Sequence, residues 1–234
     1  MSRRFLLQQF ARLPRVGRVK TRLQPALSAQ GACNIHKQLM LSTARRLVET
    51  SIPAELWLDE LGDCSTCAEI IAMGLRGPKL QHGGDLGERM LHALADGLRR
   101  ADQVVLVGSD CPDLDTPYLE QAFEALEQHE FVLGPAEDGG FVLIGCARPA
   151  AISRLLDDCS QAIASSFSGI EWGGSRALAG VRRCLDLRGH SYHLLEQRYD
   201  VDRPEDVHRW ERSQVGQVED PFAEEESRER RVQA

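Results

Sequence analysis

The sequence lacks any long apolar run. Its 234 residues are 42% hydrophobic, yet no stretch approaches the ~20 apolar residues of a membrane-spanning helix. The apolar segment Phe5-Leu6-Leu7 is too short for the core of a signal peptide, and no small-residue cleavage site follows it. We therefore expect a cytoplasmic protein without a membrane partner.

The common short motifs for metals and nucleotides are also missing. Cys64 and Cys67 form a Cys-x-x-Cys pair, but no second pair and no histidines stand at zinc-binding spacing. Seven irregularly spaced cysteines in a cytosolic chain favour reduced thiols, so we interpret this pair as chance spacing rather than as a redox or zinc site. Neither a Gly-x-Gly-x-x-Gly fingerprint nor a Walker A loop occurs.

An excess of positive charge is absent, which makes nucleic acid an unsuitable partner. The formal net charge is -7, whereas nucleic-acid-binding domains are usually basic. The charge is nevertheless uneven, because residues 3–22 contain seven basic residues and no acidic one. A basic segment on an acidic protein indicates a local anion site.

Strand-like and helix-like patterns alternate along most of the chain. Alternation of this kind predicts an α/β sandwich with a mainly parallel sheet. We expect one domain over residues 1–213 and a charged, disordered tail over 214–234. The expected strands are 5–10, 54–58, 103–107, 131–133, 141–144 and 192–195, and the expected helices are 28–51, 85–100, 175–187 and two that begin near Thr116 and Pro204.

Loops that leave the strands are the places to look for chemistry, because ligands bind beyond the carboxyl ends of the strands in open α/β sheets. The first such loop, 14–22, carries Arg15, Arg18, Lys20 and Arg22. Forked Arg donors and a Lys point charge suit phosphate groups. A solvated basic loop explains the same pattern equally well.

Two acidic segments could hold a metal ion. Asp110 directly follows a fully apolar strand and offers a hard oxygen ligand for Mg²⁺ or Mn²⁺, although an Asp here could simply cap a turn. Asp200 and Asp202 alternate on an expected strand end, so only one of them should face a shared metal. Asp202 also precedes Arg203-Pro204, a pattern that favours a helix N-cap on spacing alone.

Two glycine-rich segments complete the set. Gly83 and Gly84 lie at the start of a predicted helix, where anions and nucleotides bind readily, and Asp85 is expected to cap that helix with Glu88. The segment 134–140 carries acidic residues beside glycines, consistent with a substrate-side loop or with a tight turn. His82 and Trp172 could line a pocket, but single residues of this kind more often pack.

In their order along the chain, five segments resemble a family of small bacterial GT-A-fold transferases, long known as a domain of unknown function. Its members are often described as glycosyltransferases associated with radical-SAM, selenium or arsenosugar pathways, and the wider superfamily includes nucleotidyltransferases. The resemblance covers residues 5–208. The segments are Pro14-Arg-Val-Gly-Arg-Val-Lys-Thr-Arg-Leu23, Gly83-Gly-Asp-Leu-Gly-Glu-Arg89, Gly108-Ser-Asp-Cys-Pro-Asp-Leu114, Gly134-Pro-Ala-Glu-Asp-Gly-Gly140 and Tyr199-Asp-Val-Asp-Arg-Pro-Glu-Asp206.

This resemblance implies a GT-A three-layer sandwich and a metal-dependent transferase, active as a monomer or homodimer on a nucleotide sugar and a small-molecule acceptor. Asp110 and Asp202 would bind Mg²⁺ or Mn²⁺, and Lys20, Arg22, Asp110 and Asp138 would be catalytic. The implied nucleotide-binding residues are Arg12, Gly17, Lys20, Arg22, Gly83, Gly84, Asp85 and Ser109. The implied acceptor or sugar residues are Glu137, Asp138, Gly139, Gly140 and Trp172.

The chain departs from the family pattern at three places. Gln8 and Gln9 replace apolar strand residues, Arg12 stands where lysine is usual, and the segment Trp172-Gly-Gly-Ser lacks an expected polar pair. Two alternatives to glycosyl transfer follow. One is nucleotidyl transfer that forms a nucleotide-activated small molecule, and the other is a catalytically degenerate nucleotide-sugar-binding protein. A purely structural module would leave the basic loop and the strand-end acids unexplained.

Overall fold

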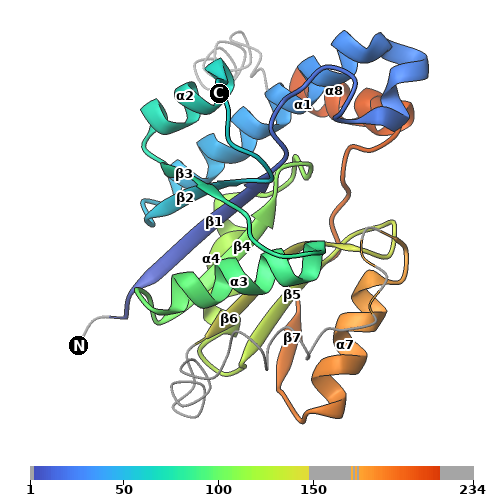
Figure 1. The fold of residues 1–234 in the computed structure, drawn as a ribbon. Coiled ribbons are helices and arrows are strands. Elements are labelled where there is room, and N and C mark those ends of the chain that lie inside the picture. Colours follow the sequence, from blue (N-terminus) through green and yellow to red (C-terminus); the bar gives the residue numbers. More distant parts are fainter. Residues whose placement is uncertain (1–2, 148–169, 171, 173, 217–234) are drawn as a thin grey trace, which may run out of the picture.

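A computed structural model describes residues 3–147, 170, 172 and 174–216 (Figure 1). Its centre is a seven-stranded sheet in the order β3-β2-β1-β4-β6-β5-β7. Every neighbouring pair is parallel except the two that include β6, so the predicted mainly parallel sheet is confirmed. The strands are β1 (Phe5–Ala11), β2 (Ala54–Leu58), β3 (Arg76–Leu80), β4 (Gln103–Gly108), β5 (Phe131–Pro135), β6 (Phe141–Ala147) and β7 (Tyr192–Leu194).

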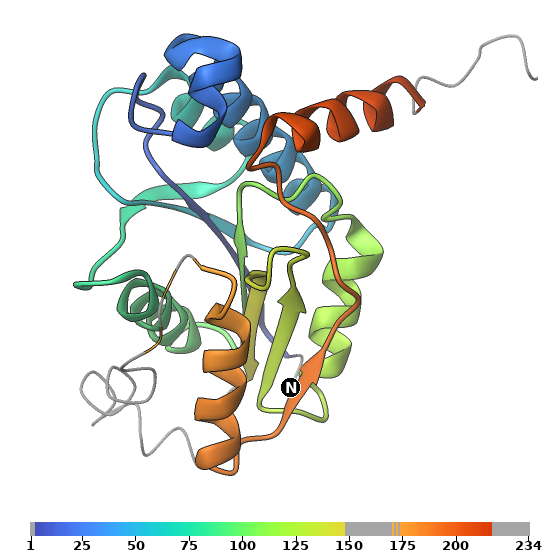
Figure 2. The same ribbon diagram turned by 90° about the vertical axis from the view of Figure 1, so that its right-hand side faces the viewer.

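Helices cover both faces of this sheet, giving three layers (Figure 2). One buried apolar cluster joins α1, α2 and α4 to one face, and a second joins α3 and α7 to the other. A third cluster holds α8 against α1, beside the sheet. The helices are α1 (Gln24–Glu49), α2 (Ser65–Met73), α3 (Leu86–Leu98), α4 (Thr116–Ala125), α7 (Ala177–Leu187) and α8 (Pro204–Gly216), with a short 3-10 helix η1 (Thr21–Leu23) before α1.

Strand β1 lies at the centre of the sheet although it contains two amides. Gln8 and Gln9 are both fully buried, where an unpaired amide is costly. The Nε2 group of Gln8 donates to the carbonyl of Ala93 on α3 at 2.7 Å. The Nε2 group of Gln9 points to the other face and donates to the carbonyl of Met40 on α1 at 2.9 Å. Each amide therefore ties β1 to the helix layer on its own side.

Capping residues fix the helix ends close to the predicted positions. The Asp85 carboxylate accepts the Glu88 N–H at 2.8 Å, and Glu88 in turn accepts the Gly84 N–H at 2.7 Å. Helix α1 begins before the predicted residue, but Ser28 interrupts it with a φ of 64°. The pair Thr116-Pro117 predicts a threonine cap with proline at the first helical position. This prediction is wrong, because Asp115 accepts the Tyr118 N–H and Thr116 is already helical.

Two elements had no clear sequence signal. Helix α2 has only nine residues, and β3 is exposed along most of its length. Helix α8 continues to Gly216, three residues past the predicted domain end, and the rest of the predicted tail, 217–234, lies outside the described residues. Within the described ranges, no helix is both long and apolar enough to cross a membrane.

Candidate functional site

The basic loop, Asp110 and the acidic segment near residue 200 meet at one edge of the sheet. Strands β1 and β4 pair in parallel up to Phe10 and Gly108, so their following loops leave the sheet side by side. Here a cavity of about 630 Å³ opens, within the usual size range of small-molecule sites. Polar and charged side chains from seven segments line it, including Arg12, Lys20, Arg22, His36, Asp59, Arg89, Asp110, Asp138, Asp200 and Asp202.

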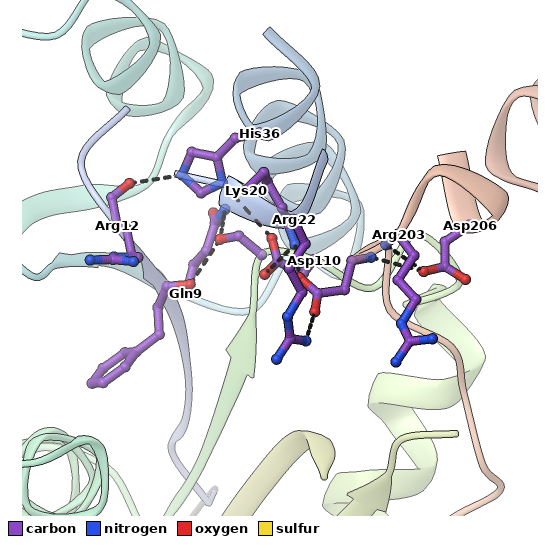
Figure 3. A network of polar contacts seen from close by, with 11 residues as sticks. Gln9, Arg12, Lys20, Arg22, His36, Asp110, Arg203 and Asp206 are labelled. Atoms are coloured by element: carbon purple, nitrogen blue, oxygen red, sulfur yellow. Dashed lines mark hydrogen bonds and ion pairs between the residues drawn. The ribbon is translucent and has the colours of Figure 1, made fainter. Parts of the chain in front are cut away.

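Lys20 is the centre of this site (Figure 3). Its ammonium group lies 2.8 Å from Asp110 Oδ2 and 3.9 Å from Asp202 Oδ1, and its side chain is only 4% exposed. The backbone of Lys20 is left-handed, with φ 46° and ψ 47°, immediately before η1. Arg22, two residues later, pairs with Asp202 but is 62% exposed. The basic loop thus places one buried and one exposed cation beside Asp202.

Asp110 carries an unusual carboxylate. Its Oδ1 atom is buried and has no hydrogen-bond partner among the described residues. The His36 ring lies nearby, with its Nδ1 3.9 Å from Oδ1. Burial acts to raise the pKa of Asp110, but the charge of Lys20 and the proximity of His36 outweigh it, so this pKa lies well below its usual value. The carboxylate is therefore ionised, with one oxygen left to accept a ligand.

His36 lies behind Asp110 on α1. Its Nε2 atom is 2.9 Å from the carbonyl oxygen of Arg12, and a carbonyl can only accept, so Nε2 carries the proton of that bond. This contact fixes the ring and directs Nδ1 toward Asp110. Sequence analysis did not identify His36, since a lone buried histidine on a helix gives no functional signal.

Asp200 and Asp202 both line the cavity. Residues 199–202 form no strand, so the alternation of faces on which our prediction was based is absent. That only one of the two faces a shared metal stays a prediction. Burial, together with the charges of Asp138, Asp110 and Asp202 and against the opposing charge of Lys20, raises the pKa of Asp200 to about 6. These acids therefore share one edge of the sheet.

The side chain of Asp202 does not cap the N-terminus of α8. Asp206 accepts both the Asp202 N–H at 3.1 Å and the Arg203 N–H at 2.7 Å. The carboxylate of Asp202 points instead to Lys20 and Arg22. The N-cap interpretation favoured by spacing is therefore wrong, and the side chain is available to the cavity.

The donor set suits a hard divalent cation. Asp110 and Asp202 converge on one point, and Asp110 Oδ1 is a buried acceptor without a donor in the described part of the chain. No three His, Cys, Asp or Glu side chains within the described ranges are grouped closely enough to hold a metal by themselves. Mg²⁺ commonly needs only one or two carboxylates, with waters and substrate phosphates as its other ligands.

Several implied nucleotide residues lie apart from the cavity. Arg12, Lys20, Arg22 and Ser109 line it, and the Ser109 hydroxyl is held between the Phe10 carbonyl and the Gln9 amide. The remaining four do not line it, although Gly17 adopts the left-handed φ of 82° that its exposed loop requires. These four are Gly17, Gly83, Gly84 and Asp85.

The implied acceptor residues are also divided. Asp138, Gly140 and Trp172 line the cavity, and Asp138 Oδ1 accepts the Gly140 N–H at 2.8 Å. Glu137 turns away and forms two hydrogen bonds with Arg209 on α8. Gly139 packs so closely on the Ser175 backbone that no side chain would fit there.

The absence of a side chain at Gly87 makes room for the Trp172 indole. A Cβ atom added to Gly87 would overlap the Trp172 indole. The ring also meets Phe141 edge to face, with 6.5 Å between the ring centroids. Gly87 on α3 thus lets the indole lie against the helix and form one wall of the cavity.

Three further lining residues were not among the predicted site residues. Asp59 follows β2 and accepts the Leu13 N–H at 2.7 Å, which fixes the start of the basic loop. Gln81 donates to the carbonyls of Ala11 and Trp57. Arg89 lines the cavity from α3. A strand-end position would have singled out Asp59, but its neighbours in the chain form no motif.

The cysteine pair lies away from the cavity. Cys64 caps α2 by accepting the Cys67 N–H at 3.2 Å, and the two sulfurs are 2.6 Å apart as free thiols. Burial and the Cys64 thiol raise the pKa of Cys67 to about 12. With no zinc-type cluster among the described residues, the pair acts here as a helix cap.

Solved structures with this architecture are numerous. A protein of Desulfovibrio desulfuricans G20, provisionally named a nucleotide-diphospho-sugar transferase, matches with a TM-score of 0.73 and 26% identity over 93% of this chain and 89% of its own. A CMP:2-keto-3-deoxy-manno-octonic acid synthetase in complex with CTP matches at 0.57 and 11% identity, over 92% and 100%.

A third match is the glucosyl-3-phosphoglycerate synthase of Mycobacterium tuberculosis, in complex with Mg²⁺ and UDP. Its TM-score is 0.53 at 12% identity, and the match covers 88% of this chain and 74% of the other. Together with the sheet order, these matches confirm the predicted GT-A-like α/β fold. No curated protein matches the chain.

A family model covers more than half of the chain. It matches residues 43–174, and its description reads uncharacterized protein conserved in bacteria, DUF2064. The matched range includes Asp110, Asp138 and Trp172 of the cavity. The predicted resemblance is confirmed: the chain belongs to this bacterial family of GT-A-like fold.

Proposed function

We propose that this protein is a metal-dependent transferase that uses a nucleoside-diphosphate sugar as donor and a small molecule as acceptor. The observation that carries the proposal is the arrangement of Lys20, Asp110 and Asp202 within one cavity at the carboxyl ends of β1 and β4. It brings a buried cation and a carboxylate with one oxygen lacking a donor to the place where α/β sheets bind nucleotides. A purely structural module needs neither feature.

The chain's own groups suit a diphosphate leaving group. Lys20 and Arg22 would bind its phosphate oxygens, where negative charge grows as the bond to the sugar breaks. Asp110 and Asp202 would hold Mg²⁺ or Mn²⁺. When bound, the metal ion supplies further positive charge against the same oxygens. His36 keeps Asp110 in place through its contact with the Arg12 carbonyl.

Asp138 and Trp172 of the cavity lining would bind the sugar and the acceptor. Their segments pack together, because Gly139 lies against the backbone of Ser175. An indole face suits the apolar surface of a sugar ring, and a carboxylate suits its hydroxyl groups. We assign Asp138 the orientation of the acceptor hydroxyl, because Gly140 holds its carboxylate at a fixed place.

Nucleotidyl transfer is the second candidate function. The names of relatives in both reaction classes support it, since one solved structure of this fold is a CMP-sugar synthetase bound to CTP. In that reaction, the acceptor would attack the α-phosphate of a nucleoside triphosphate and pyrophosphate would leave. The same cations would then face the departing pyrophosphate.

A thermal-shift screen tests the proposal. Nucleoside di- and triphosphates and nucleotide sugars would be added with and without Mn²⁺ or Mg²⁺. A ligand present at 100 times its dissociation constant adds about 2.7 kcal/mol to the free energy of unfolding. We expect one base to stabilise the protein only when metal is present. Turnover of the matching sugar donor, or of the triphosphate with release of pyrophosphate, then separates the two candidates.

The same screen can reject the proposal. Absence of any metal-dependent stabilisation across all bases would rule out the nucleotide site. Binding without turnover of any donor would favour a catalytically degenerate nucleotide-sugar-binding protein. Trp172 and its neighbours, where the chain departs from the family pattern, are the segment to which such a loss would be traced.

A further inference from the structure

The ammonium group of Lys20 lies where the two proposed metal ligands converge. It is 2.8 Å from Asp110 Oδ2 and 3.9 Å from Asp202 Oδ1, with 4% of its side chain exposed. Mg²⁺ binds carboxylate oxygens at 2.0–2.1 Å. A divalent ion bound to both Asp110 Oδ2 and Asp202 Oδ1 would lie between these two oxygens, in the space that the ammonium occupies, and the two positive charges would repel each other strongly.

The ammonium is also held there firmly. Burial removes most of the water that could solvate it, so its charge depends on the two carboxylates. The left-handed backbone of Lys20 is uncommon for a residue with a side chain and sets the direction in which the side chain leaves the loop. Lys20 is thus an internal cation placed at the metal position.

Phosphate oxygens would offer this cation another partner. Lys20 lines the cavity, and a lysine side chain can swing its point charge on a flexible stem. A diphosphate in the cavity would accept the ammonium and leave Asp110 free. Metal ion and diphosphate would then each remove an obstacle to the binding of the other.

We propose that Lys20 competes with the divalent metal ion for Asp110 and Asp202, and that a nucleoside diphosphate relieves this competition by binding the Lys20 ammonium. The inference rests on the proposed function. It adds a binding order to that function, because the metal ion binds weakly by itself and strongly together with the nucleotide. By linkage, the metal strengthens nucleotide binding by the same factor.

The test measures Mn²⁺ affinity, by electron paramagnetic resonance of the free ion, in the intact protein without a donor or an acceptor. Lys20→Met removes the charge and keeps a chain of similar length. We expect this variant to bind Mn²⁺ alone at least 10-fold more tightly than the wild type. Lys20→Arg keeps the charge and should retain weak binding.

Arg22→Met is the matched control. It removes the same charge from a residue that also pairs with Asp202 but is 62% exposed and does not contact Asp110. We expect its Mn²⁺ affinity to change less than 3-fold. If Arg22→Met and Lys20→Met raise the Mn²⁺ affinity equally, the general positive potential of the site controls metal binding, and the inference is overturned.

Nucleotide provides the second readout. UDP, GDP, CDP and ADP are each added to the Mn²⁺ titration. The base that binds should raise wild-type Mn²⁺ affinity, and Lys20→Met should lose most of this increase. If Mn²⁺ binds the wild type and Lys20→Met with equal affinity, the inference fails and the proposed function stands. If Mn²⁺ binds neither protein, alone or with any nucleotide, the metal site and the inference both fail.

Discussion

Two groups of charged residues in this molecule look similar and behave differently. The binding cluster consists of Lys20, Arg22, Asp110, Asp200 and Asp202. The structural cluster consists of Glu55, Lys79, Asp96 and Arg100, which join β2, β3 and α3. Each pairs acidic side chains with one Lys and one Arg at hydrogen-bonding distance.

The difference lies in how completely the acids are paired. Glu55 is 1% exposed, yet both of its carboxylate oxygens accept from Arg100, and Lys79 lies 3.2 Å away. Burial acts to raise the pKa of Glu55, but these partners outweigh it and the pKa is lowered. Asp110 keeps a buried oxygen without a donor among the described residues, and the pKa of Asp200 rises to about 6. A fully paired cluster stabilises a fold, whereas an underpaired one in a cavity is suited to a ligand.

Asp110→Asn makes the sharpest test of this distinction, and its effect should be the largest. The amide keeps the shape but removes the charge that would hold the metal ion and Lys20. We expect the metal-dependent part of nucleotide binding to disappear and turnover to fall at least ~100-fold, the scale of a lost electrostatic contact at a reacting centre. Thermal-shift titration and an assay with the identified donor measure the two effects. Unchanged turnover in a folded variant would remove Asp110 from the mechanism.

Glu55→Gln should have the opposite effect, lowering the free energy of unfolding while leaving nucleotide binding unchanged. It leaves the Arg100 and Lys79 charges without their buried partner, which typically costs about 3 kcal/mol or more. Urea denaturation should show this loss in the free energy of unfolding. Nucleotide affinity, measured at a temperature where the variant is folded, should stay within 3-fold of wild type. A large loss of affinity at full folding would mean that the clusters are not separate.

The pH dependence of the stability difference between wild type and Glu55→Gln provides the control. The lowered pKa of Glu55 means that its contribution is fully present above the pKa of an unfolded Glu, about 4.3. It is lost as the pH falls through the lower folded value. The stability gap between wild type and Glu55→Gln should therefore be constant near neutral pH and shrink below about pH 4. A gap that persists at acidic pH would point to packing rather than charge.

Arg22→Met should give the smallest change in stability. Exposed ion pairs contribute only about 0–1 kcal/mol, so the urea midpoint should barely move. Nucleotide affinity should nevertheless fall, by about 10-fold, because one phosphate contact is lost. Isothermal titration with the identified nucleotide measures it. If the nucleotide affinity is unaltered, Arg22 does not contact the nucleotide and is an ordinary surface charge.

Much of the fold follows from local sequence patterns. The continuous apolar run of β4 and the spaced apolar residues of α3 predicted both elements, and Asp85 was recognised as a cap by its distance from Glu88. Helix α2 and strand β3 were missed, because a nine-residue helix offers little periodicity and an exposed edge strand needs few apolar residues. The cap of α4 moved by one residue, since Asp115 and Thr116 are both good caps and only the backbone decides between them.

The site was less predictable than the fold. Asp110 could be found because its rigid strand fixes where it leaves the sheet. For Asp200 and Asp202, strand alternation was assumed, but their segment forms no strand and both of them line the cavity. Glu137 and Asp138 are neighbours with the same chemistry, and only the position of Arg209 on α8 reveals that one of them turns away. Long-range partners of this kind leave no mark in a short motif.

Gln8 and Gln9 have a consequence for how the sheet assembles. A parallel strand that is buried on both faces and entirely apolar could slide along its neighbours with little change in burial. In β1, a shift of one residue would turn both amides to the wrong helix layer, away from Ala93 and Met40. The misaligned strand would bury both Nε2 groups without an acceptor, in addition to the two Oε1 atoms, which already lack a donor among the described residues. The two glutamines thus set the register of β1 in the sheet. This register aligns the ends of β1 and β4, from which Lys20 and Asp110 reach the same cavity.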